Sequence, residues 1–192
     1  MISRGLAAVV GLALLLGVAD AGSSQGFGID RLQRLLAERS QADVQFTELR
    51  ESRWLAAPLE SSGTLRSSGS VLEKRVEHPR RETWRILADR IQVSVGGSGN
   101  FHEVQLNASS TAALLASTLR DVMAGRLDAL DKDFRLDLAG DERSWTLLLT
   151  PRSGEVSSRL KEISLEGAGS RLLVIAVVES QGDRTTTKLR YE

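Results

Sequence analysis

Hydrophobic residues recur with two different periods along this chain, and the periods separate helices from strands. Ile29, Leu32, Leu35 and Leu36 follow the spacing of a helix face, which predicts one amphipathic helix of about three turns. From Val44 onward apolar and polar residues alternate, which is typical of strands. Six strands are predicted in this half, at residues 44–54, 62–67, 70–77, 83–88, 91–95 and 101–106.

A second helix is predicted in the middle of the chain. Ser109 and Ser110 can cap it, Gly125 can end it, and residues 126–132 add a turn or two. Alternation then returns, and Gly140 with Asp141 is predicted to turn the chain between the first two of the later strands. These later strands are predicted at residues 134–138, 145–149, 163–165, 172–178 and 184–191.

The predicted fold class is α+β, with one antiparallel sheet of about eleven strands and two main helices in a single domain. Short connections such as residues 96–100, which are rich in Gly, imply antiparallel neighbours. A sheet of this size curls because strand twist accumulates, and two helices are too few to cover it densely. Two alternatives stay open, a concave apolar cavity and an ordinary packed core, and periodicity alone favours the core.

The first 21 residues have the pattern of a cleaved export signal. Arg4 precedes an apolar run of fourteen residues, and Ala19-Asp20-Ala21 has the form of a cleavage site. The run is shorter than the roughly 18 to 20 residues that cross a bilayer, so a signal peptide is favoured over an anchor. We therefore expect a signal peptide at 1–21, a flexible Gly/Ser-rich leader at 22–28 and a folded domain at 29–192 in the periplasm.

Charge and composition exclude several classes of function. The chain has 25 Lys plus Arg and 25 Asp plus Glu, and this balance argues against nucleic acid as a partner and against polybasic attachment to lipid headgroups. It has no Cys, which excludes disulfides, thiolate zinc sites and thiol nucleophiles. His78 and His102 have no metal-site spacing, and no Gly-x-Ser-x-Gly motif occurs. We expect no catalytic residue, no metal and no cofactor, and therefore not an enzyme.

Several segments of the C-terminal half form a recognisable pattern. Residues 145–152 are an aromatic-led apolar strand that ends in Leu-Thr-Pro and a basic residue. The pattern continues through residues 160–165 and 177–185, and residues 46–48 and 62–65 stand where the first strands would lie. In order and spacing, residues 29–191 resemble the LolA family of periplasmic outer-membrane lipoprotein carriers.

The resemblance implies an incomplete β-barrel with a helical lid over an apolar cavity that shields the acyl chains of a lipoprotein. It also implies transfer from an inner-membrane release complex to an outer-membrane acceptor by a soluble, monomeric shuttle. In the family, the second strand hairpin carries a basic residue followed by Pro, and that Arg helps latch the lid. Residues 67–70 of this chain contain neither. The latch role is not transferred to the nearby Arg66, Lys74 or Arg75. A specialised acylated or polyene lipid as cargo, and a non-catalytic scaffold, remain alternatives.

The predicted cavity lining consists of inward-facing strand positions and one face of the second helix. The strand residues are Val44, Phe46, Leu65, Leu72, Trp84, Ile86, Ile91, Val93, Trp145, Leu147 and Leu149. The helix residues are Leu115, Leu119 and Val122. Plain core packing is the alternative for each residue taken singly, so the prediction concerns the set.

Overall fold

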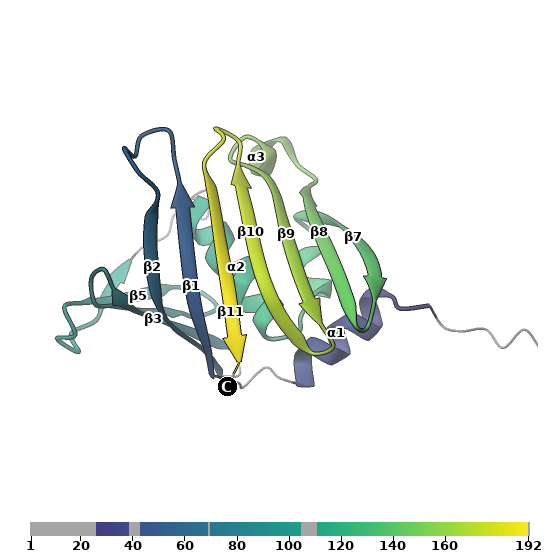
Figure 1. The fold of residues 1–192 in the computed structure, drawn as a ribbon, viewed down its shortest axis with the longest axis horizontal. Helices are drawn as coiled ribbons and strands as arrows, with labels where there is room; N and C mark the ends of the chain where they lie inside the picture. Colours follow the sequence, from purple (N-terminus) through teal and green to yellow (C-terminus); the bar gives the residue numbers. More distant parts are fainter. Residues whose placement is uncertain (1–25, 39–42, 69, 105–110, 192) are drawn as a thin grey trace, which may run out of the picture.

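One antiparallel sheet dominates the computed structural model, which describes residues 26–38, 43–68, 70–104 and 111–191 (Figure 1). Within these residues the sheet has eleven strands in the order β6-β5-β4-β3-β2-β1-β11-β10-β9-β8-β7. Consecutive strands are neighbours except for β6 and β7, which lie at opposite edges, and the pairing of β1 with β11 joins the two halves of the chain. The predicted signal peptide and the proposed caps Ser109 and Ser110 lie outside the described residues.

The strands are short, and alternation in burial is clearest in the strands at Ser144–Pro151 and Leu160–Ala168. They are β1 (Asp43–Glu51), β2 (Leu59–Ser68), β3 (Val71–His78), β4 (Glu82–Ile86), β5 (Ile91–Val95), β6 (His102–Val104), β7 (Phe134–Asp141), β8 (Ser144–Pro151), β9 (Leu160–Ala168), β10 (Arg171–Glu179) and β11 (Arg184–Tyr191). In the described part of the chain β6 and β7 are edge strands, so the sheet is not closed.

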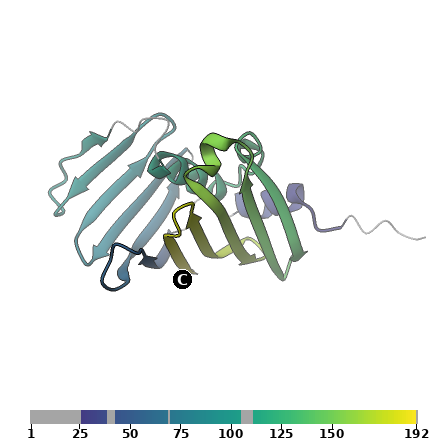
Figure 2. The same ribbon diagram turned by 90° about the horizontal axis from the view of Figure 1, so that it is seen from above.

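The longer helices lie on one side of this sheet. They are α1 (Ile29–Glu38) and α2 (Thr111–Met123), followed by a single turn of 3-10 helix, η1 (Asp128–Leu130), and by the short α3 (Gly154–Ser157). Figure 2 shows the two halves of the sheet meeting at an angle, with α2 between them. The structure confirms the predicted α+β class and the incomplete barrel with a helical segment against its concave face.

A bulge between β2 and β3 contributes to the bend of the sheet. The pairing register of these strands shifts between Ser62 and Gly63. An ideal Cβ built on Gly63 would lie 1.8 Å from the carbonyl oxygen of Arg75, so only glycine permits this approach of the two backbones. Bulges increase local twist, which turns the wing formed by β3 to β6 toward the helices.

The hydrophobic core lies between the sheet and the helices. Leu32 and Leu36 of α1, together with Leu127 and Leu130 after α2, pack against inward-facing strand residues such as Phe134. All of these side chains belong to one contiguous cluster. Burial of such a cluster provides the main stabilisation of a fold without disulfides.

Three local predictions differ from the structure. The strand predicted to reach Trp54 ends at Glu51, and α3 was not predicted. Gly140 and Asp141 do not form the turn between β7 and β8, because both belong to β7. The Asp141 carboxylate accepts hydrogen bonds from the backbone N–H of Arg143 and Ser144 at 2.8 and 3.1 Å. This Asx-type capping moves the turn two residues further along the chain.

Candidate binding groove

A largely apolar groove of about 530 Å³ lies between α2 and the concave face of the sheet. Its volume falls in the range typical of small-molecule sites. Eight of the strands contribute to it, so residues far apart in the sequence form one surface. The strand side of the lining comprises Glu48, Arg50, Leu59, Ser61, Lys74, Val76, Glu82, Trp84, Ile86, Ile91, Ile163, Leu165, Ile175, Val177, Thr185 and Thr187.

The helix α2 provides the opposite wall through one face. Leu115, Leu119 and Val122 are spaced four and three residues apart, which places them on the same side of a helix. Burial rises along the helix, because Ala112 is exposed whereas Val122 is fully buried. The N-terminal half of α2 therefore stands over the open part of the groove, and the C-terminal end is embedded in the core.

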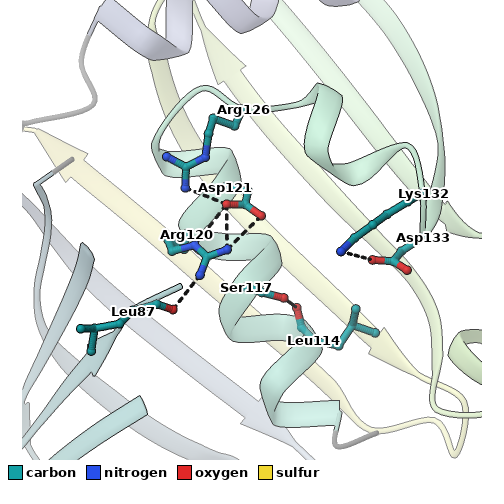
Figure 3. Close-up of polar contacts among 8 residues, drawn as sticks. All are labelled: Leu87, Leu114, Ser117, Arg120, Asp121, Arg126, Lys132 and Asp133. Carbon is teal, nitrogen blue, oxygen red and sulfur yellow. Dashed lines mark hydrogen bonds and ion pairs between the residues drawn. The ribbon is translucent and has the colours of Figure 1, made fainter. Parts of the chain in front are cut away.

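Polar contacts fix the C-terminal end of α2 (Figure 3). The Arg120 guanidinium donates to the carbonyl oxygen of Leu87, directly after β4, at 2.6 Å. The Asp121 carboxylate accepts from Arg120 at 3.1 Å and from Arg126 at 2.7 Å. The side chains of Arg120 and Asp121 are only 13% and 12% exposed, so water screens this pair weakly. These contacts attach α2 to the wing of the sheet that contains β4.

An ion pair interrupts the apolar wall of the groove. Lys74 on β3 donates to both carboxylate oxygens of Glu48 on β1, at 2.9 and 2.8 Å. Thr187 on β11 donates to the same carboxylate at 2.9 Å, and the Lys74 ammonium lies 4.8 Å from the centroid of the Phe46 ring. The pair is mostly buried and its charges are compensated within the wall, so it adds polarity without an unpaired charge.

A second, larger hollow of about 880 Å³ lies outside the concave face. It is formed by the N-terminal end of α1 and the turn between β7 and β8. Its lining is mostly polar and charged, and the exposed ion pair of Arg31 with Glu142 crosses it at 2.6 Å. An apolar ligand would gain little there, and the groove under α2 is therefore the better candidate site.

The structure places six of the fourteen predicted lining residues in the groove. These are Trp84, Ile86, Ile91, Leu115, Leu119 and Val122. The other eight do not line it and lie in the packed core instead: Val44, Phe46, Leu65, Leu72, Val93, Trp145, Leu147 and Leu149. Three of the eight lie on β8, which contributes no residue to the groove, and Val44 and Phe46 lie toward the other end of β1 from the lining residues Glu48 and Arg50.

Sequence reasoning missed lining residues of two kinds. Ile163, Leu165, Ile175 and Val177 on β9 and β10 lie in the wall. Alternation with polar neighbours could have identified the two on β9, whereas β10 is apolar throughout this stretch and gives no such signal. The polar residues could not be identified in this way, since Glu48 and Lys74 are in contact only because β1, β2 and β3 are neighbours in the sheet. No local motif indicates that contact.

Other kinds of site have little support in the described residues. No cluster of three or more metal-ligating side chains occurs among them. His78 and His102 are exposed and do not line the groove. Within the same residues no helix combines the length and the apolar character that crossing a bilayer requires.

Comparison with known proteins gives one family match. A sequence model of the family described as "Outer membrane lipoprotein carrier protein LolA-like" matches residues 21–190. Among curated proteins no match was found. A solved structure of a LolA superfamily protein from Nitrosomonas europaea is 10% identical over 84% of this chain and 89% of its own, with a TM-score of 0.47. A domain of an outer membrane lipoprotein-sorting protein from Vibrio parahaemolyticus is 9% identical over 88% and 92%, with a TM-score of 0.42.

Proposed function

We propose that this chain, which belongs to the LolA-like family of outer membrane lipoprotein carrier proteins, is a periplasmic carrier. It shields the acyl part of a lipoprotein or a related lipid from water between the inner and the outer membrane. An inner-membrane release complex supplies the cargo and an outer-membrane acceptor receives it. The carrier acts as a soluble monomer.

The observation that supports this proposal is the apolar groove under α2. With about 30 Å³ for a methylene group, similar to the share of a water molecule in the liquid, 530 Å³ holds about 18 methylene groups. This capacity corresponds to one long acyl chain. Each methylene removed from water gains roughly 0.8 kcal/mol, so a seated chain gains on the order of 10 kcal/mol before the costs of association.

The volume of the groove determines whether α2 must move to admit a cargo. A cargo with several acyl chains fits only if the N-terminal half of α2 moves away from the sheet, because the described groove holds one. The helix is suited to such movement, since Arg120 and Asp121 fix its C-terminal end while Ala112 at the other end is exposed. A lid that opens at one end lets the cargo in and then excludes water.

The same capacity favours one alternative cargo. A single-chain acylated product, or a polyene lipid, fills the groove without any movement of α2. The protein is then a carrier for one specialised lipid and not for the general lipoprotein pool. Both proposed functions are non-catalytic. Replacing His78 or His102 by Ala should therefore leave cargo binding unchanged.

Native mass spectrometry of the mature protein, purified from the periplasm without detergent, tests the proposal. We expect an acylated species bound in stoichiometric amount, and its mass distinguishes a lipoprotein from a specialised lipid. A ligand-free mass, combined with failure to take up an added fluorescent fatty acid, would contradict the carrier function and leave a scaffold as the better explanation.

A further inference from the structure

The connection between β1 and β2, residues 52–58, exposes large apolar side chains at the open end of the groove. Trp54 is 78% exposed and Leu55 is 41% exposed. Leu59, the first residue of β2, is 49% exposed and also lines the groove. The described residues include two other exposed large hydrophobic side chains, Val95 and Leu173, and each of these is less exposed.

Hydrogen bonds hold this connection in a defined shape. The backbone N–H of Leu55 donates to the carbonyl oxygen of Ser52 at 3.0 Å, and that of Trp54 donates to the Ser52 hydroxyl at 3.3 Å. Arg53 donates to the side chain of Gln181 at 2.7 Å, which joins the connection to the turn between β10 and β11. Figure 1 shows these two segments side by side at one end of the sheet. The fold therefore presents Trp54 to solvent in a fixed position.

The surroundings of Trp54 have the composition of a surface that meets phospholipid. The Arg53 guanidinium lies 5.0 Å from the centroid of the Trp54 ring. Arg50 and Arg80 are exposed residues of the groove lining; Arg50 lies 3.9 Å from the carboxylate of Glu179, and Arg80 makes no ion pair within the described residues. Trp is enriched where membrane meets water, and guanidinium groups bind phosphate oxygens by paired hydrogen bonds.

We propose that residues 52–58, with Arg50 and Arg80 beside them, dock on the surface of a phospholipid bilayer and bring the open end of the groove against it. The inference rests on the proposed carrier function, because docking shortens the path through water of an acyl chain that passes between the groove and a donor or acceptor in the membrane. Leu59 makes the exposed apolar surface continuous with the groove wall. Since the chain has no net charge, apolar contact provides most of the affinity and binding persists in high salt.

Trp54 itself reports on docking. The chain has three Trp residues, of which Trp145 is fully buried and Trp84 is partly buried under α2. Phosphatidylcholine vesicles, alone and mixed equally with phosphatidylglycerol, are added to the wild-type protein while its emission is recorded. We expect a blue shift that is absent from the Trp54→Phe variant, together with co-sedimentation of protein and vesicles.

Substitution separates docking from cargo binding. Trp54→Ser and Leu55→Ser should each lower vesicle affinity by about tenfold or more, because burying a large apolar side chain contributes over 1.4 kcal/mol. Leu173→Ser is the matched control. Leu173 is 37% exposed and lies near the start of β10, whereas residues 52–58 contact the turn after the end of β10. The vesicle affinity of this variant should equal that of the wild type. Uptake of a fluorescent fatty acid from solution should be unchanged in all three variants.

The outcomes distinguish this proposal from the carrier function. If the wild-type protein takes up fatty acid but binds no vesicles, the docking proposal is overturned and the carrier function stands. Residues 52–58 would then be better explained as the contact surface for a protein partner. Vesicle binding that Trp54→Ser and Leu55→Ser do not weaken would also overturn it. A wild-type protein that takes up no fatty acid would instead contradict the carrier function.

Discussion

Replacing Leu119 by Asp should abolish acyl binding while the protein stays folded. Leu119 lies on the groove face of α2 and is only partly buried. In the empty protein the new carboxylate can stay hydrated in the open groove, so the loss of stability is limited to about 1–2 kcal/mol from lost apolar contact and lower helix propensity. A seated acyl chain removes that hydration.

The effect on binding follows from the cost of desolvation. Covering an unpaired carboxylate costs several kcal/mol in real proteins, and each 1.4 kcal/mol is a factor of ten in affinity. We therefore expect at least about a hundredfold weaker binding of a fluorescent fatty acid, measured by titration. Urea unfolding of the same sample measures stability.

Leu114→Asp is the matched control for this experiment. Leu114 is a partly buried leucine on the same helix, but it does not line the groove. We expect a similar loss of stability with fatty-acid affinity retained. If Leu119→Asp binds the fatty acid like the wild type, the groove is not the acyl site. If it unfolds while Leu114→Asp folds, Leu119 belongs to a solid core.

The remaining predictions concern stability. Asp121→Asn should lower the free energy of unfolding by about 3 kcal/mol, because it leaves the poorly exposed Arg120 without a compensating charge. A loss below about 1 kcal/mol in urea unfolding would show that the pair behaves like an exposed one. Burial raises the pKa of Glu73, but hydrogen bonds and charge from Arg85 and Arg75 outweigh burial and hold the pKa below its ordinary value of 4.5. Glu73 therefore stabilises the fold fully above that pH, and the contribution is lost as the pH falls further. Glu73→Gln should be less stable than the wild type at neutral pH and should show a smaller loss on acidification, measured by thermal unfolding; equal pH profiles would contradict this assignment.

Local patterns in the sequence determined most of the secondary structure. Strict alternation places β5 at Ile91–Val95, where it was predicted, and helical spacing places Leu115, Leu119 and Val122 on one face of α2. These features depend on neighbours within a few residues. They were predictable because side-chain direction in a strand or helix follows directly from its period.

Turn positions were less predictable from sequence. Gly140 and Asp141 have the composition of a turn, yet they continue β7, and the Asp141 side chain caps the turn that follows. Composition identifies a region where the chain reverses. The hydrogen bonds of one side chain decide the residue at which it does so.

Tertiary structure alone decided which part of the concave face stays open. The alternation of Val44, Leu147 and Leu149 is the same as that of Ile86 and Ile91, and all five are buried, yet only Ile86 and Ile91 also line the groove. The difference follows from position in the sheet, because β8 contributes no residue to the groove and Val44 lies at the other end of β1 from the lining residues Glu48 and Arg50.

The polar part of the groove depends on tertiary structure in the same way. Glu48 meets Lys74 and Thr187, which lie 26 and 139 residues away in the chain. Only the order of strands in the sheet brings these side chains together. Alternation in the sequence fixes which side of a strand a residue faces, and long-range packing fixes whether that side meets a neighbour, a cavity or water.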